Sequence, residues 1–137
     1  MAAETELWFA SLPSRDELQE AFARWGELVS IRSGGYRLIE PGAEQDDDGD
    51  HDPRAGVPID AIIDVAAPQS VLALAPAAHE GLRISVMMTG SRGFWLARVT
   101  ASLQGPLGGV IYVPSTGEAF ADAHAYELSW PGEHTHG

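Results

Sequence analysis

Short runs of apolar and β-favouring residues alternate along the chain with proline, glycine and polar clusters. Runs of this kind are typical of strands, and the clusters between them mark turns. Ser33, Gly34 and Gly35 predict a hairpin between two of the runs. The expected strands cover residues 7–10, 28–31, 36–39, 59–65, 70–74, 82–88, 110–113 and 118–120.

One helix is marked by strong end signals. Ser14 and Glu17 form the S-x-x-E pattern of a capping box, which satisfies two backbone N–H groups at a helix start. We expect Glu20 and Arg24 to pair on the solvent side, and Gly26 stands where a C-terminal glycine is common. The apolar stripe at i, i+3, i+4 and i+7 consists of Leu18, Ala21, Phe22 and Trp25.

A second helix, apolar on most sides, is predicted from an N-cap at Ser91 to about Leu103, with residues 104–106 ending it. The order of elements gives two β-α-β-like halves with extra strands between them. This order predicts an α+β fold: a mixed, mostly antiparallel sheet of about five to seven strands with two helices on one face, in the ferredoxin-like split βαβ manner. We expect a single domain over residues 1–137, with an acidic loop over 40–57 and a flexible tail over 131–137.

The amino-acid composition excludes several classes of function. The chain has 20 acidic residues, 8 arginines, no lysine and no cysteine, and its net charge is −12. Without cysteine it has no disulfide framework, thiolate nucleophile or iron–sulfur ligand, and without lysine it forms no Schiff base. The charge argues against direct binding of nucleic acid, which needs clustered positive side chains. We expect no cofactor.

The cellular location follows from similar arguments. The N-terminal segment is acidic and lacks the pattern of a signal peptide. The most apolar stretch, residues 57–78, is interrupted by aspartates and prolines, so no membrane span is predicted. We therefore expect a cytoplasmic protein, and the absence of both lysine and asparagine, whose codons are AT-rich, suggests a GC-rich bacterial genome.

The acidic loop is the most unusual local feature. It does not match a calcium-binding EF-hand, because Gly49 comes too early and Val57 occupies the position of the bidentate glutamate. One interpretation is a solvated charge run, and the other is an anionic patch that docks into a basic cleft of a partner. Trp130, outside the periodic part, is a candidate aromatic anchor. The candidate partner-binding residues are Glu44, Asp46, Asp47, Asp48, Asp50, Asp52 and Trp130.

Other motifs point less clearly to chemistry. His134 and His136 have a strand-like spacing but no third ligand, so no metal site is assigned. Residues 90–93 lie between a strand and a helix and could hold an anion on backbone N–H groups, although an ordinary N-cap turn is the simpler reading. His79 and Glu80 are expected in an exposed turn. No catalytic residue is assigned.

One segment resembles a known family. Phe94-Trp95-Leu96-Ala97-Arg98 leads through Gly108-Gly109 into a strand that ends in Val113-Pro114-Ser115-Thr116-Gly117-Glu118. This segment is similar to one in small bacterial immunity proteins, the antidotes of polymorphic and contact-dependent toxin systems, where Asp stands in place of Val113. The resemblance implies a mixed sheet-and-helix fold that acts by occluding a toxin's active site. It carries over no binding residues.

The sequence therefore favours a non-enzymatic inhibitor that binds a basic partner, a cognate toxin, and occludes its active site through acidic surface. One alternative is a ferredoxin-like small-molecule-binding domain or enzyme, in which Arg37, Arg83 and Arg92 hold an anion between sheet and helices and a histidine acts as acid or base. Another is an accessory domain that self-associates through an exposed sheet edge. The partner's identity, the strand order and the oligomeric state are left open.

Overall fold

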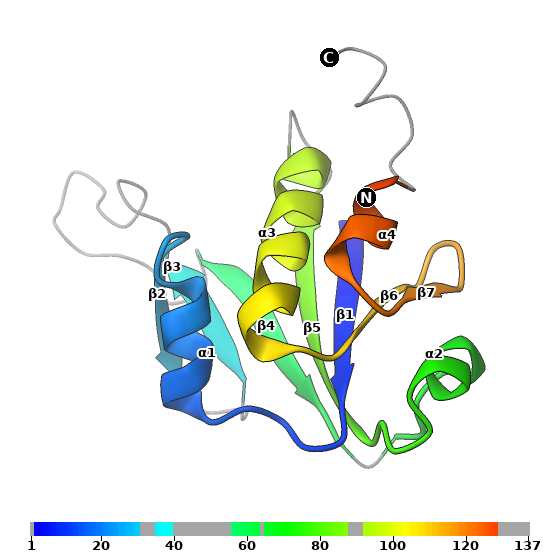
Figure 1. The fold of residues 1–137 in the computed structure, drawn as a ribbon. Helices are drawn as coiled ribbons and strands as arrows, with labels where there is room; N and C mark the ends of the chain where they lie inside the picture. Colours follow the sequence, from blue (N-terminus) through cyan, green and yellow to red (C-terminus); the bar gives the residue numbers. More distant parts are fainter. Residues whose placement is uncertain (1, 31–34, 40–55, 64, 88–91, 129–137) are drawn as a thin grey trace, which may run out of the picture.

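The computed structural model describes residues 2–30, 35–39, 56–63, 65–87 and 92–128 (Figure 1). In these ranges seven strands form one antiparallel sheet in the order β2-β3-β4-β5-β1-β6-β7, so the predicted α+β class and the expected sheet size are confirmed. The strands are β1 (Ala2–Phe9), β2 (Glu27–Ser30), β3 (Tyr36–Ile39), β4 (Val57–Ile62), β5 (Glu80–Met87), β6 (Val110–Val113) and β7 (Glu118–Phe120). The helices are α1 (Arg15–Phe22), α2 (Gln69–Leu74), α3 (Arg92–Leu107) and α4 (Ala123–Leu128).

The first strand of the chain lies inside the sheet. β1 pairs along its whole length with β5, from Ala2 opposite Met87 to Phe9 opposite Glu80, and on its other side with β6. Because both pairings are antiparallel, β5 and β6 run in the same direction, and α3 connects them (Figure 1). The ferredoxin-like split and a set of only two helices on one face are not confirmed, because the chain has four helices in the described ranges and α4 joins α1 and α3 on the same core.

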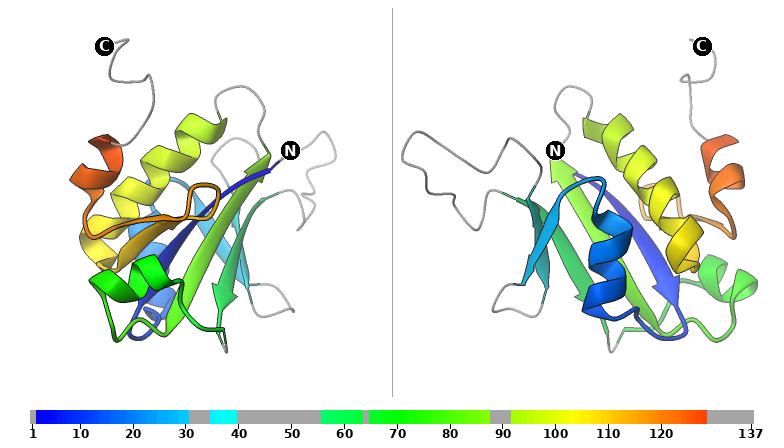
Figure 2. Two further views of the ribbon diagram at one scale, coloured as in Figure 1. Left: turned by 90° about the vertical axis from the view of Figure 1, so that its right-hand side faces the viewer. Right: turned by 60° about the vertical axis from the view of Figure 1, so that its left-hand side comes forward.

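Side-chain alternation gives the sheet two different faces. In β1, Leu7 and Phe9 belong to the main core, whereas Trp8 belongs to a second, smaller core. Helices α1 and α3 cover the main-core face (Figure 2), and Tyr126 of α4 adds to the same core. Helix α2 lies against β6 and β7 and contributes Val71 to the smaller core, which also contains Trp8, on the opposite face. No helix in the described ranges is long and apolar enough to cross a membrane.

The strand predicted over 70–74 is wrong, because this segment forms α2. Pro68 precedes the helix, and its carbonyl oxygen accepts hydrogen bonds from the N–H groups of Val71 and Leu72, both at 3.0 Å. Val71 is fully buried, whereas Leu74 is 48% exposed. A run this short shows no periodicity that separates a strand from a helix, so contact with the sheet decides between them.

The end of α3 also differs from the prediction. Pro106 lies inside the last turn, and the helix continues to Leu107. The residue that follows the helix is Gly108, whose φ is +74° and whose N–H donates to the Gln104 carbonyl oxygen at 2.8 Å. Near a helix end proline removes only one hydrogen bond, and the two glycines that follow provide the positive φ values that reverse the chain.

Helix α4 was not expected. Asp122 immediately precedes it, and its Oδ1 accepts a hydrogen bond from the N–H of Ala125 at 2.8 Å. Tyr126 is buried and lies against Phe120 of β7, with ring centroids 5.5 Å apart. A cap at the start and one aromatic contact therefore hold this short helix on the sheet.

Candidate functional site

The residues predicted to bind a partner lie outside the described residues. The six acidic candidates belong to the segment between Ile39, the last residue of β3, and Val57, the first residue of β4, and Trp130 follows α4 in the sequence. Ser91, His134 and His136 also lie outside the described ranges. The partner-binding candidates concerned are Glu44, Asp46, Asp47, Asp48, Asp50, Asp52 and Trp130.

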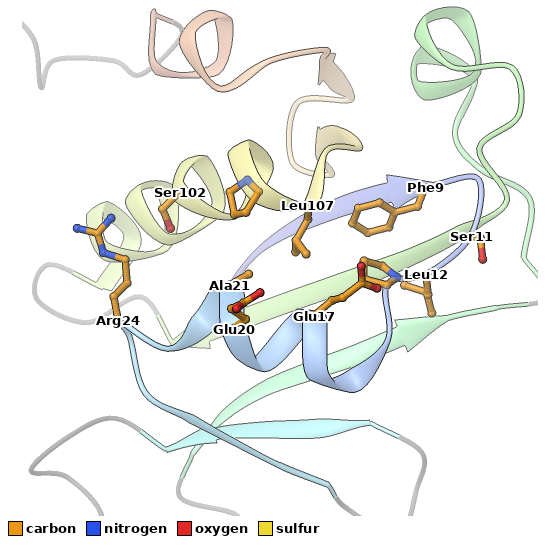
Figure 3. A pocket seen from close by; sticks show the side chains of 11 residues that line it. Phe9, Ser11, Leu12, Glu17, Glu20, Ala21, Arg24, Ser102 and Leu107 are labelled. Carbon is orange, nitrogen blue, oxygen red and sulfur yellow. The ribbon is translucent and has the colours of Figure 1, made fainter.

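The described surface has a groove between α1 and the C-terminal part of α3 (Figure 3). Its volume is about 730 Å³. Apolar side chains come from the end of β1, from the β1–α1 connection and from the end of α3, and two carboxylates come from α1. The lining residues are Phe9, Ser11, Leu12, Pro13, Glu17, Glu20, Ala21, Arg24, Ser102, Pro106 and Leu107.

The β1–α1 connection, which forms one end of the groove, is tied to the start of β5. The N–H of Leu12 donates to Glu80 Oε1 at 2.8 Å, and the N–H of His79 donates to the Phe9 carbonyl oxygen at 2.8 Å. Of the predicted exposed pair, His79 is exposed but Glu80 is half-buried as the first residue of β5. Glu80 therefore positions the chain at the groove and is not a free surface acid.

The spacing of α1 and α3 is set by Trp25. Its Nε1 donates to Ser102 Oγ at 2.8 Å, and that hydroxyl donates in turn to the Val99 carbonyl oxygen at 2.8 Å. The Trp25 ring also meets Trp95 of α3 edge to face, with centroids 6.1 Å apart and planes at 86°. The two walls of the groove are therefore held together at one end.

Glu17 has a structural role in the groove wall. Its Oε1 accepts from the Ser14 N–H at 2.9 Å, and its own N–H donates to Ser14 Oγ at 3.2 Å, which confirms the predicted capping box. Glu20 is exposed, and the predicted pair with Arg24 is wrong. Helix α1 ends at Phe22, so Arg24 is no longer one helical turn beyond Glu20, and its guanidinium lies 5.5 Å from the Trp25 ring centroid.

The outer edge of β2 is covered by side chains of α1. Arg15 Nη2 donates to the Leu28 carbonyl oxygen at 3.1 Å, and Gln19 Oε1 accepts from the Leu28 N–H at 2.8 Å. Arg15 Nε also donates to Ser30 Oγ at 3.3 Å. The N–H and carbonyl oxygen that Leu28 would offer to a second chain at this edge are thus occupied.

A charged network lies on the sheet face away from α1 and α3. Glu6, only 6% exposed, accepts from Trp8 Nε1 at 2.8 Å and from the Nε and Nη2 of Arg83, both at 3.2 Å. Arg37 lies on the same face, since Leu38 beside it belongs to the main core. Arg37 and Arg83 therefore do not lie between the sheet and α1 or α3, where the alternative interpretation requires an anion site.

Within the described part of the chain, no three His, Asp or Glu side chains lie close enough together to hold a metal ion. Comparison of the chain with protein-family models, curated proteins and solved structures finds no match. The groove is the candidate site that we consider further, and it combines apolar side chains with two carboxylates and one guanidinium.

Proposed function

We propose that this protein is a non-enzymatic inhibitor that acts in the bacterial cytoplasm. In this proposal it binds a basic toxin and occludes the toxin's active site through acidic surface. The toxin is its cognate partner, as the resemblance to immunity proteins implies.

The observation that carries the proposal is the unequal use of charge among the described side chains. Arg15, Arg24, Arg37 and Arg83 contact backbone oxygens, a tryptophan ring or carboxylates of the same chain, and Arg98 is exposed. Many carboxylates, in contrast, are exposed and have no ion-pair or hydrogen-bond partner among the described residues. They are Asp16, Glu20, Glu27, Glu118 and Glu127.

This asymmetry supports binding to a basic protein. Internal contacts engage most of the described arginines, so the described surface that remains for a partner is mainly acidic, and the chain as a whole has a net charge of −12. An acidic surface attracts a basic partner over a distance comparable to the Debye length and accelerates encounter. Acidic side chains can also occupy a cleft that the partner uses for an anionic substrate.

The alternative of an anion-binding pocket has less support. A carboxylate pair dominates the charge of the groove, and two of the three arginines expected to hold an anion, Arg37 and Arg83, lie on the other face of the sheet. Thermal shift measurements with a metabolite panel test this alternative, because an anionic ligand would raise the melting temperature.

A growth-rescue experiment tests the proposed function. The protein encoded next to this chain's gene is expressed in a bacterial host with and without this chain. We expect the neighbour to stop growth when it is expressed alone, and this chain to restore growth. A harmless neighbour, or a toxin that this chain fails to neutralise, contradicts the proposal.

A charge-neutralised variant tests the part played by the acidic loop. We expect weaker rescue from the loop variant than from a control variant that removes equal charge from other exposed positions. Equal rescue by the two variants would show that the acidic loop has no special part in binding the partner. The loop variant carries Glu44→Gln, Asp46→Asn, Asp47→Asn, Asp48→Asn, Asp50→Asn and Asp52→Asn. The control carries Glu4→Gln, Asp16→Asn, Glu27→Gln, Glu118→Gln, Asp122→Asn and Glu127→Gln.

A further inference from the structure

We propose that the groove between α1 and α3 is the docking site for an arginine side chain, presented by the partner within an otherwise apolar segment. The inference rests on the proposed function, because it names the surface of this chain that a basic partner contacts. It concerns the described groove and makes no use of the acidic loop.

The shape of the groove suits a short segment of chain. A volume of about 730 Å³ lies within the range of sites that hold small ligands or a few side chains. Phe9, Leu12 and Leu107 provide apolar surface (Figure 3), and Pro13 and Pro106 also line the groove. When apolar side chains of the partner cover this surface, the burial is favourable. We therefore expect apolar residues on both sides of the arginine in the partner's sequence.

The charge of the groove selects the sign of its occupant. Glu17 and Glu20 of α1 both line the groove (Figure 3). Glu17 uses Oε1 for the helix cap, and the carboxylate of Glu20 has no partner among the described residues. The lining cation, Arg24, forms no ion pair with either of them and lies over Trp25.

A guanidinium fits these groups better than other charged groups do. It binds a carboxylate through two parallel N–H···O bonds, and its flat face packs on apolar and aromatic surface. An anionic side chain would be repelled by both carboxylates. The groove therefore favours a cationic side chain between apolar neighbours over a neutral or acidic one.

Nuclear magnetic resonance titration of the full chain tests the inference, with acetyl-Leu-Arg-Leu-amide as the probe. The control peptides replace the arginine by glutamine or by glutamate. We expect the arginine peptide to shift the backbone signals of Ala21, Ser102 and Leu107 saturably, and to bind more tightly than both controls. Equal binding of the three peptides, or no saturable shift at these positions, overturns the inference.

Two single substitutions separate a local contact from general attraction. Glu20→Gln is expected to weaken binding of the arginine peptide about 2- to 5-fold, the usual range for an exposed ion pair. Glu118→Gln removes the same charge from exposed β7 and should leave the affinity unchanged. Equal weakening by both substitutions shows long-range attraction alone and overturns the assignment of the groove. Both side chains are exposed, so both variants should fold.

The peptide titration and the growth rescue fail independently. Rescue without peptide binding in the groove would retain the inhibitor and remove the groove as its contact site. Specific peptide binding without rescue would retain the groove as a site for arginine and reject the inhibitor.

Discussion

Replacement of Glu6 by alanine removes an acceptor that two side chains share. The Glu6 carboxylate is 6% exposed and accepts hydrogen bonds from Trp8 and Arg83 on the sheet face away from α1 and α3. Trp8, itself 2% exposed, belongs to the small core under α2. We therefore expect the substitution to destabilise the contact between α2 and the sheet.

The expected loss follows from the two interactions. Without Glu6 the buried indole N–H of Trp8 has no acceptor, which costs about 1–3 kcal/mol. The ion pair with Arg83 adds less than about 1 kcal/mol, because the Arg83 side chain is 39% exposed and water screens the pair. The free energy of unfolding should thus fall by about 1–4 kcal/mol, and the melting temperature by roughly 3–16 °C.

Two control substitutions separate the contributions. Glu6→Gln removes the charge but keeps an oxygen for Trp8, so the loss should be only about 1 kcal/mol. Glu4→Ala removes a carboxylate that is 41% exposed and 4.0 Å from Arg83, so the loss should be below about 0.5 kcal/mol. The bond to Trp8, rather than the charge, should therefore account for most of the effect.

Urea unfolding followed by tryptophan fluorescence measures these differences in the free energy of unfolding. Trp8 and Trp25 belong to different cores, so the signal reports on both. The expected order of stability is wild type and Glu4→Ala close together, then Glu6→Gln, then Glu6→Ala. If Glu6→Ala were no less stable than Glu4→Ala, the reasoning about the buried indole N–H would be refuted.

Further substitutions test the groove walls and the sheet edge. Gly109→Ala should cost about 3 kcal/mol in chemical unfolding, because its Cβ would lie 2.7 Å from Phe9 Cε1 at a φ of +89°. Gly108→Ala should cost only about 1 kcal/mol, since its Cβ meets open space; equal costs would contradict the clash. Trp25→Phe should lower the free energy of unfolding by about 1 kcal/mol through loss of the bond to Ser102, and no loss would show that this bond does not hold α1 to α3. The double variant Arg15→Ala, Gln19→Ala should increase self-association in light scattering, because it uncovers the edge of β2, and an unchanged mass at high concentration would contradict this role.

Local signals in the sequence predicted much of the fold. The Ser14–Glu17 cap starts α1 where expected, and Leu18 and Phe22 of the apolar stripe are buried. Strands β3, β6 and β7 have the predicted bounds, and β2 is shifted by one residue from its predicted range. These features depend on neighbours within a few residues, which the sequence shows directly.

The errors come from segments that other parts of the chain decide. The run 70–74 is helical where Val71 joins the smaller core, whose other members, such as Trp8 and Val110, are remote in sequence. Asp122 is a local signal for the start of α4, because aspartate is a common N-cap residue. Pro106 fits within α3 because the helix ends one residue later.

No pattern in the sequence predicts the groove. Its apolar floor joins Phe9 to Leu107, and its end is held by the bond from Leu12 to Glu80. Each of these residues has an ordinary local context, and only the packing of α1 beside α3 brings them together. The acidic charge, in contrast, was evident from composition.

The salt dependence of the complex shows whether acidic surface of this chain drives its binding to a basic partner. The dissociation constant of the full chain and the neighbouring gene's product is measured by calorimetry between about 50 and about 500 mM salt. We expect one-to-one binding that competes with the partner's substrate, and a dissociation constant that rises by roughly tenfold or more over this range. Binding whose strength does not change with salt, or a complex that leaves the partner's active site open to substrate, would contradict it.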